Sequence, residues 1–289
     1  MQTVIGLGEA GCKIAEELAQ YPQYTVLKID ADDVPKDRKL KNTLTLKRRP
    51  TPEAYEKAGS LRFKTFFKDI EDETLFITSC GNVSALSLRI LEHVKKKSKI
   101  TLMYVVPDKT NLTEHQRLHN NLLFNVFQEY ARSAVFERII LVNNETLSGI
   151  VGPVPILKYW STLNTLIAST YHMINVFDHS RPVFTTLSNR INTARITTLG
   201  HYPWTTEGEN EEKMFFSLDF PREKRYYYAV PQTMLEEDEN LMAVIQKQVK
   251  DAVEHDRMKV GYAIYSTQYD QPYVYCEGYS TLIQKNPAS

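Results

Sequence analysis

Cysteine is scarce in this chain: three occur among 289 residues, at positions 12, 80 and 276, with no C-x-x-C pair. This excludes the usual zinc-site spacing and argues against a disulfide framework. Net charge is also missing, because 35 Lys and Arg balance 35 Asp and Glu, so no overall field draws the chain to nucleic acid or to an anionic membrane. No apolar run approaches the ~20 residues of a membrane span. We therefore expect a cytoplasmic protein without a membrane or nucleic-acid partner.

Metal-site patterns are absent from the histidines as well. None of the seven histidines stands in an H-E-x-x-H motif. His115 and His119, four residues apart, are better interpreted as neighbours on one helix. We therefore assign no metal ligands to the chain.

The chain does contain enough apolar material for a sizeable core. Hydrophobic residues make up 42% of it, including 17 Tyr and 12 Phe, which is typical of a globular protein. At roughly 100–200 residues per domain, the length favours two domains.

Strand-like and helix-like segments alternate through the first half of the sequence. Apolar runs rich in β-branched residues are followed by stretches with helical periodicity. This alternation predicts an α/β domain with a mostly parallel sheet and helices on both faces. The expected strands are 3–7, 25–29, 74–78, 100–106 and 138–142, and the expected helices are 12–20, 85–97 and 114–132.

A long helical pattern over 157–176 follows this first half. Additional apolar residues flank its main stripe, so we expect the helix to be buried on more than one side. The residues that define the stripe, three or four positions apart, are Trp160, Leu163, Ile167, Tyr171 and Ile174.

Beyond residue 182 the sequence becomes rich in Thr and Tyr, which favours strands. We expect a C-terminal α+β domain with an antiparallel or mixed sheet. Its predicted strands are 195–199, 214–220, 225–230, 260–267 and 273–282, with one helix at 239–254. The chain would then consist of an α/β domain at 1–155, a central helix at 156–178 and the α+β domain at 179–289.

The motif G-L-G-E-A-G at residues 6–11 lies between the first strand and the first helix. Amides at such a helix N-terminus can bind phosphate oxygens, although the glycines could simply close a tight turn. A Rossmann oxidoreductase would add an acidic residue after the second strand, and Asp30 or Asp32 could take that place. The motif alone leaves the nucleotide open, and nothing after Asp32 favours NAD.

Four segments together resemble one family. V-I-G-L-G-E-A-G-C-K at 4–13 is similar to the first phosphate loop of FtsZ, and 74–107 is similar to the strand, glycine-rich loop, helix and strand that follow in that family. R-I-I-L-V-N-N-E-T-L-S-G-I at 138–150 resembles the I-D-N-E-A-L segment, and L-N-T-L-I-A-S-T at 163–170 resembles the L-N-x-L-V-S-A-T of the tubulin core helix. The chain is identified as a small, divergent member of the tubulin/FtsZ superfamily, compact enough for a phage or plasmid homologue.

The resemblance implies a GTPase-type nucleotide-binding domain, a long core helix and a C-terminal α+β domain. It implies GTP or GDP as ligand, with Mg²⁺ carried by the nucleotide. Asn144 and Asn164 would recognise guanine, since amide side chains offer donors and acceptors to a purine edge, and Glu114 would contact the ribose. The full predicted nucleotide site is Gly8, Glu9, Ala10, Gly11, Cys12, Asp30, Asp32, Gly81, Asn82, Ser84, Glu114, Asn144 and Asn164.

Two departures from the family concern phosphate binding and hydrolysis. Residues 79–85 read S-C-G-N-V-S-A instead of G-G-G-T-G-T/S-G, so we expect a shorter cradle in which Val83 is an obstacle. In the family, acidic residues after the core helix orient water in the neighbouring subunit's site. The matching stretch 184–189 has no carboxylate, and Asp178 is the nearest one before it. We therefore predict weak or absent GTPase activity and assign no catalytic residue.

Two functions remain open at this point. The first is a cytoskeletal or scaffold protein that binds guanine nucleotide and forms head-to-tail filaments with itself. The second is a non-enzymatic adaptor or regulator that has lost nucleotide binding and polymerisation and acts on another tubulin-like polymer. Binding of GTP or GDP distinguishes the two.

Overall fold

The computed structural model describes residues 1–289 except 32–41, 60–61, 207–209, 254–256 and 289. The chain divides into two compact units, and the division falls within helix α7 (Tyr159–Asp178). Unit 1 comprises Met1–Ser169 and Lys285–Ser289, and unit 2 comprises Thr170–Gln284. In the described part of the chain, no helix is long and apolar enough to cross a membrane.

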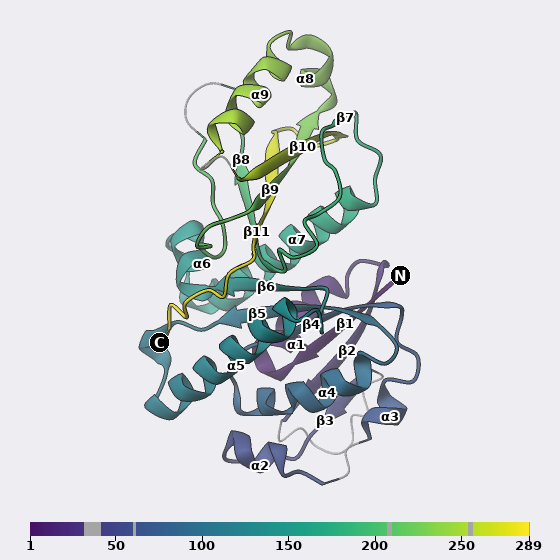
Figure 1. Ribbon diagram of the computed structural model, residues 1–289, viewed down its shortest axis with the longest axis vertical. Coiled ribbons are helices and arrows are strands. Elements are labelled where there is room, and N and C mark those ends of the chain that lie inside the picture. Colours follow the sequence, from purple (N-terminus) through teal and green to yellow (C-terminus); the bar gives the residue numbers. More distant parts are fainter. Residues whose placement is uncertain (32–41, 60–61, 207–209, 254–256, 289) are drawn as a thin grey trace. The chain divides into compact units, whose positions relative to one another are not determined.

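Unit 1 is built on a parallel sheet (Figure 1). Its described strands lie in the order β3-β2-β1-β4-β5-β6, and each neighbouring pair is parallel. The predicted α/β architecture is thus confirmed. The elements before α7 are β1 (Gln2–Leu7), α1 (Gly8–Leu18), β2 (Tyr24–Asp30), β3 (Thr43–Thr45), α2 (Pro52–Glu56), α3 (Phe63–Phe66), β4 (Glu73–Thr78), η1 (Asn82–Leu86), α4 (Ser87–Val94), β5 (Lys99–Val106), η2 (Lys109–Asn111), α5 (Glu114–Arg132), β6 (Arg138–Asn143), α6 (Asn144–Val151) and η3 (Ile156–Lys158).

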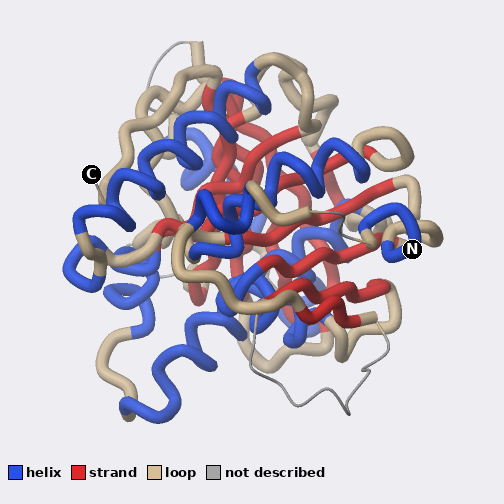
Figure 2. The backbone as a smooth tube through the Cα atoms, turned by 90° about the horizontal axis from the view of Figure 1, so that it is seen from below, coloured by secondary structure: helices blue, strands red, loops and turns tan. Residues whose placement is uncertain are grey.

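The central strands of unit 1 are buried along nearly their whole length, as expected where both faces of a parallel sheet are covered. Helix α1 packs on β1, β2 and β4, while α5 packs on β5 and β6. Figure 2 distinguishes the helices, in blue, from the strands, in red. Helix α5 begins at a capping box in which the Thr113 hydroxyl accepts from the Gln116 amide and the Gln116 side chain accepts from the Thr113 amide.

Unit 2 contains a mixed sheet, with described strands in the order β8-β11-β9-β10-β7. Only the β9–β10 pair is parallel among these pairings, so of the two predicted possibilities, an antiparallel or a mixed sheet, the structure has the mixed one. Every residue of β9 is buried. Helix α9 packs on β10, where Leu241 and Ile245 enter the apolar core. The elements of unit 2 after α7 are β7 (Phe184–Thr185), β8 (Ile196–Pro203), β9 (Glu223–Pro231), α8 (Gln232–Glu237), α9 (Leu241–Asp251), β10 (Lys259–Thr267) and β11 (Tyr273–Ser280).

One predicted strand is wrong. The segment 214–220 makes a single isolated bridge, from Met214 to Gly200, and otherwise has no regular structure. The side chains of Phe215 and Phe216 are both buried, so the segment still contributes to the core. Phe220 has a φ of 49°, outside the range of a strand, so the backbone cannot continue as a strand there.

Candidate functional site

A cavity of about 360 Å³ opens where several parallel strands of unit 1 end. Leu7 is the last residue of β1, Ser79 follows β4, and Asn144 follows β6. The carboxyl ends of parallel strands are the usual ligand-binding edge of such sheets, and the volume is typical of small-molecule sites. The lining residues are Leu7, Gly8, Glu9, Ala10, Lys13, Ser79, Gly81, Ser84, Val105, Asn144, Trp160 and Asn164.

The N-terminus of α1 faces this cavity. Gly8 opens the helix with a φ of 73°, in the left-handed region that favours glycine. The N-cap residue, Leu7, is aliphatic and gives no side-chain hydrogen bond to the helix. A Cβ built on Gly8 meets nothing within 4 Å. The backbone at Gly8 can therefore be approached closely by an anion.

The other two glycines of the motif serve packing. A Cβ on Gly6 would lie 2.5 Å from the carbonyl oxygen of Gly11, and a Cβ on Gly11 would lie 2.4 Å from the carbonyl oxygen of Ile77. Glycine at these positions lets α1 approach β1 and β4 closely. Gly11 is not among the residues that line the cavity.

The second loop of the cavity, between β4 and α4, contributes Ser79, Gly81 and Ser84. The Ser79 hydroxyl donates to the Val105 carbonyl at 2.6 Å, and the Ser84 hydroxyl donates to the Gly81 carbonyl at 2.5 Å. A Cβ on Gly81 meets nothing within 4 Å. These contacts hold a short loop with an open backbone position at the cavity.

Two side chains of this loop lie elsewhere. The predicted site residue Asn82 donates from Nδ2 to the Pro50 carbonyl at 2.9 Å and does not line the cavity. Val83 is 7% exposed and is also absent from the lining. The expectation that Val83 obstructs the cradle is therefore wrong, because its side chain is buried outside the cavity.

The two predicted guanine-binding asparagines reach the same cavity from different elements. The Asn143 side chain caps α6 by accepting from the Glu145 amide at 3.0 Å. The next residue, Asn144, lines the cavity. Asn164 lies on α7. The side-chain amides of Asn144 and Asn164 make no hydrogen bond to any residue that the structure describes. Their donors and acceptors are thus available to a ligand.

Trp160 is a site residue that the sequence did not predict. Its place in the apolar stripe of the core helix predicted burial, yet the residue is 55% exposed and lines the cavity. Residues four apart lie on the same helix face, so the indole stands beside Asn164. This i, i+4 pair of an aromatic ring and an amide was the signal in the sequence that could have identified it.

The remaining predicted residues are more dispersed. Cys12 and Asp30 line a second cavity of about 430 Å³, which shares Glu9 and Lys13 with the first. Burial raises the pKa of the Cys12 thiol to about 12, so it is not a thiolate near neutral pH. Glu114, at the start of α5, lines neither cavity. Asp32 lies outside the described residues.

Among the described residues that line the first cavity, the charged ones are Glu9 and Lys13. The Lys13 ammonium pairs with the Glu16 carboxylate at 3.1 Å, and this hydrogen bond raises the pKa of Lys13. The Glu9 carboxylate lies beside the helix terminus and opposes an anionic ligand there. Among the described residues, no group of three or more His, Cys, Asp or Glu side chains could hold a metal ion.

Comparison with known proteins supports the fold strongly. No protein-family model matches the sequence, and no curated protein matches it. Among solved structures, GDP-form protofilaments of Bacillus thuringiensis serovar israelensis TubZ match with 14% identity, a TM-score of 0.70, and coverage of 98% of this chain and 88% of TubZ. The M. jannaschii FtsZ dimer matches with 13% identity, a TM-score of 0.66 and coverage of 96% and 87%. The chain has the tubulin/FtsZ fold.

A GTPγS-bound protofilament of Haloferax volcanii CetZ2 also matches, with 13% identity, a TM-score of 0.69, and coverage of 97% of this chain and 94% of CetZ2. The likeness extends over nearly the whole chain, so both the parallel sheet of unit 1 and the mixed sheet of unit 2 belong to this tubulin/FtsZ fold. At 13–14% identity it establishes the fold and not the activity.

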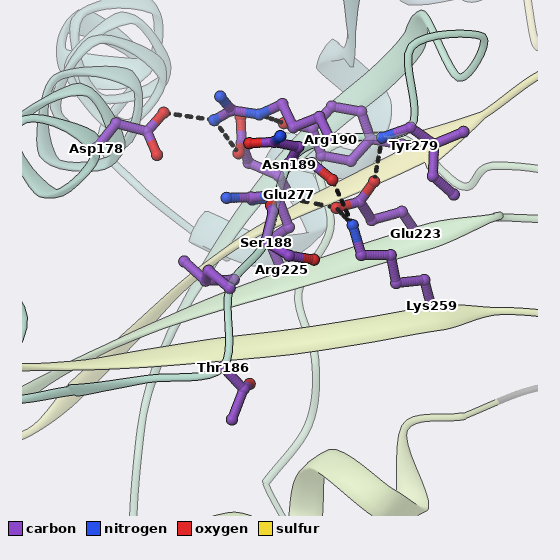
Figure 3. Close-up of polar contacts among 12 residues, drawn as sticks. Asp178, Thr186, Ser188, Asn189, Arg190, Glu223, Arg225, Lys259, Glu277 and Tyr279 are labelled. Atoms are coloured by element: carbon purple, nitrogen blue, oxygen red, sulfur yellow. Dashed lines mark hydrogen bonds and ion pairs between the residues drawn. The ribbon is translucent and has the colours of Figure 1, made fainter.

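In this tubulin/FtsZ fold, the segment that follows the core helix α7 is tied to the sheet of unit 2. Asp178, the last residue of α7, accepts from the Tyr227 hydroxyl at 2.9 Å. Figure 3 shows its ion pair with the Arg190 guanidinium. The Arg225 guanidinium donates to the Ser188 carbonyl at 2.8 Å, and Lys259 donates to the Asn189 carbonyl. The segment is therefore held by several polar contacts, and the Asp178 charge is compensated.

Proposed function

We propose that this chain is a tubulin-like cytoskeletal or scaffold protein that binds guanine nucleotide and self-associates, with weak or absent hydrolysis. The observation that carries the proposal is a single cavity that collects the N-terminus of α1, the Ser84 loop and the amides of Asn144 and Asn164. Side chains from four separate regions of the sequence converge there, and each is suited to a different part of a nucleotide.

The base would bind at the end of the cavity formed by Asn144, Trp160 and Asn164. Amide groups can pair with both donors and acceptors on a guanine edge, and neither amide is engaged elsewhere in the described chain. The exposed Trp160 indole offers a flat apolar surface for stacking.

The phosphates would bind between the α1 terminus and the Ser84 loop. Gly8 and Gly81 leave open space at the cavity, and first-turn amides attract anions. The Glu9 carboxylate opposes the phosphate charge, and a Mg²⁺ ion carried by the nucleotide would offset this repulsion. We expect the affinity for nucleotide to depend on Mg²⁺ for this reason.

Self-association is supported by the assemblies of the structural neighbours. TubZ and CetZ2, which match over nearly the whole chain, were solved as protofilaments. A repeated head-to-tail contact of this kind uses a heterologous interface that does not close. We therefore propose filaments or open oligomers as the assembled form.

Hydrolysis would be slow because the segment after α7 offers no available carboxylate. Residues 184–189 contain none, and Asp178 is engaged by Arg190 and Tyr227. A carboxylate paired with a guanidinium is a poor general base. Assembly would then persist after nucleotide binding instead of being reversed by turnover.

One observation favours a second function, an adaptor that binds no nucleotide. Glu9 lines the cavity where phosphates would bind, and Lys13, a cation of the same lining, is paired with Glu16. The Glu9 carboxylate would then repel phosphate strongly enough to exclude a nucleotide from the cavity. Such an adaptor would act on the assembly of another tubulin-like protein.

Assembly assays distinguish these functions. Purified protein is incubated with GTP and Mg²⁺, with GDP and Mg²⁺, or without nucleotide, and is then followed by right-angle light scattering and negative-stain electron microscopy. The proposed function predicts filaments or oligomers whose formation depends on nucleotide and on protein concentration. A monodisperse monomer in all three conditions contradicts it and favours the adaptor.

A further inference from the structure

Behind the candidate phosphate loop lies a buried pair of polar side chains that the proposed site does not yet use. Ser84 is 2% exposed and His119 is 9% exposed, and the His119 Nε2 lies 3.0 Å from the Ser84 Oγ. Ser84 itself lines the cavity. The hydroxyl therefore lies between the ligand space on one side and an imidazole on the other.

The number of available protons determines which atom of the Ser84–His119 pair is the hydrogen-bond donor. The Ser84 hydroxyl has a single proton, which it gives to the Gly81 carbonyl at 2.5 Å. The contact with His119 must then run from Nε2–H to the Ser84 oxygen. His119 consequently donates to the serine oxygen, and the hydroxyl proton, which now bonds the Gly81 carbonyl, can exchange that acceptor for another without loss of the His119 contact.

The imidazole is held in place by its own helix. His119 lies on α5, which begins at the Thr113 capping box. The next residue, Asn120, is fully buried and accepts from the Tyr104 hydroxyl of β5 at 2.7 Å. These contacts anchor α5 on both sides of His119 along the chain, so the ring has little freedom to move away from Ser84.

We propose that His119 is a positioning residue for the nucleotide phosphate. Its Nε2–H holds the Ser84 oxygen so that the hydroxyl proton can turn from the Gly81 carbonyl to a phosphate oxygen when nucleotide binds. This inference rests on the proposed function, because it assumes that phosphate occupies the cavity beside Ser84. No covalent step is involved.

The pair also gives nucleotide affinity a pH dependence. Burial lowers the pKa of His119, with an opposing effect from Glu53 of α2 and a smaller lowering effect from His115 of α5. On the η1 side the ring faces the Ser84 hydroxyl. A neutral ring already donates from Nε2, and protonation keeps this donor and adds a positive charge near the phosphate. Phosphate binding therefore raises the pKa of His119, and affinity increases as pH falls through that pKa.

The test measures GDP affinity of the full chain by calorimetric titration with Mg²⁺, from about pH 5.5 to about pH 8. His119→Phe removes the donor and keeps a ring, and we expect it to weaken GDP binding about tenfold, the effect of one lost hydrogen bond. His119→Gln keeps an N–H donor that cannot titrate. It should bind GDP nearly as well as the parent protein near neutral pH but lose the gain at acid pH. His115→Gln, on the same helix but outside the cavity lining, is the matched control and should keep the neutral-pH affinity.

The outcomes separate this inference from the proposed function. If the parent protein binds no GDP, the proposed function fails and this inference fails with it. If the parent protein binds GDP and both His119 variants match it at every pH, the proposed function stands and the positioning role is overturned. Should His119→Phe not fold, His119→Gln decides alone: a flat pH profile supports the role, and a parental profile contradicts it.

Discussion

Gly8 and Gly11 stand three residues apart in one motif, yet the structure requires glycine at each for a different reason. Gly8 has a positive φ and open space in front of it, so its backbone faces the cavity. Gly11 faces the Ile77 carbonyl and has no room for a Cβ. The two interpretations that the motif left open, phosphate binding and tight packing, thus apply to different glycines of the same motif.

Substitution at Gly11 should destabilise the protein through packing. In Gly11→Ala the new methyl group would lie 2.4 Å from the Ile77 carbonyl oxygen, so α1 must move away from β4 at a cost of roughly 1–3 kcal/mol. Gly149→Ala is the matched control, because a Cβ there meets nothing within 4 Å and alanine favours a helix by up to about 1 kcal/mol. Urea unfolding of both variants checks this, and equal midpoints would contradict the packing role of Gly11.

The Glu9 carboxylate should weaken nucleotide binding. Glu9→Gln removes a negative charge from the cavity lining while nearly preserving the shape of the side chain. We expect GDP to bind about threefold to tenfold more tightly, with a smaller gain at high salt because ions screen the repulsion.

The control for Glu9→Gln is Glu92→Gln, on α4 and outside this cavity. Titration of both variants with GDP at two ionic strengths makes the comparison. An unchanged affinity in Glu9→Gln would show that phosphate does not lie beside this carboxylate.

At the scale of the element, the sequence predicted α5 correctly at both ends, 114 and 132. The capping threonine, the apolar face and the turn after the helix all predict the same helix boundaries. The strand predicted at 214–220 was wrong because β-forming residue types do not show that the segment pairs only at Met214 and that Phe220 adopts a positive φ. The predicted burial of Trp160 was also wrong. Periodicity identifies the helix face on which a residue lies, but not whether that face contacts protein or a cavity at that turn.

The sequence could not show the polar cluster of unit 2, since its members lie on separate elements. Glu277 of β11 is fully buried and pairs with Arg190 at 3.1 Å, and the oxygen of the Tyr227 hydroxyl lies 2.8 Å from its carboxylate, so Glu277 and Asp178 share one hydroxyl proton. The Arg190 side chain also reaches Asp178 and the Tyr279 hydroxyl. Because its guanidinium also donates to the Tyr227 hydroxyl of β9 at 3.4 Å, Arg190 connects α7 with strands β9 and β11.

Removal of Arg190 should destabilise unit 2. Arg190→Met removes the half-buried Arg190 cation from the buried Glu277 carboxylate, and loss of one partner of a buried pair costs up to about 3–5 kcal/mol. The double variant Arg190→Met with Glu277→Gln should recover part of this loss. Arg132→Met, which breaks the exposed pair with Glu129, is the control and should change stability by less than about 1 kcal/mol.

Fluorescence can report on unit 2 alone in this experiment. The chain has two tryptophans, the exposed Trp160 in unit 1 and the buried Trp204 in unit 2. In a Trp160→Phe background, denaturant unfolding is followed through Trp204. Equal stability losses in Arg190→Met and Arg132→Met would contradict the anchoring role of Arg190.

At the scale of the whole molecule, the order of segments along the chain was sufficient to predict the fold. The order and spacing of the glycine turns, buried strands and core-helix segment resemble those of the tubulin/FtsZ family, and the fold agrees although identity with solved structures is only 13–14%. The site was predictable in part for the same reason: Gly8, Asn144 and Asn164 follow strand ends or lie on the core helix. The direction of Asn82 and Val83 and the exposure of Trp160 depend on tertiary packing, which no local pattern encodes.

The central claim is that one cavity of unit 1 binds a guanine nucleotide, and equilibrium titration of the full chain with GDP and Mg²⁺ tests it most directly. We predict saturable binding of GDP with one site per chain, no comparable binding of ADP or NAD, and a loss of about tenfold or more in Asn164→Ala. Asn125→Ala, whose side chain bonds within α5 instead, should bind GDP as the parent protein does. An absence of GDP binding up to roughly 1 mM, or binding that Asn164→Ala leaves unchanged, would contradict the account.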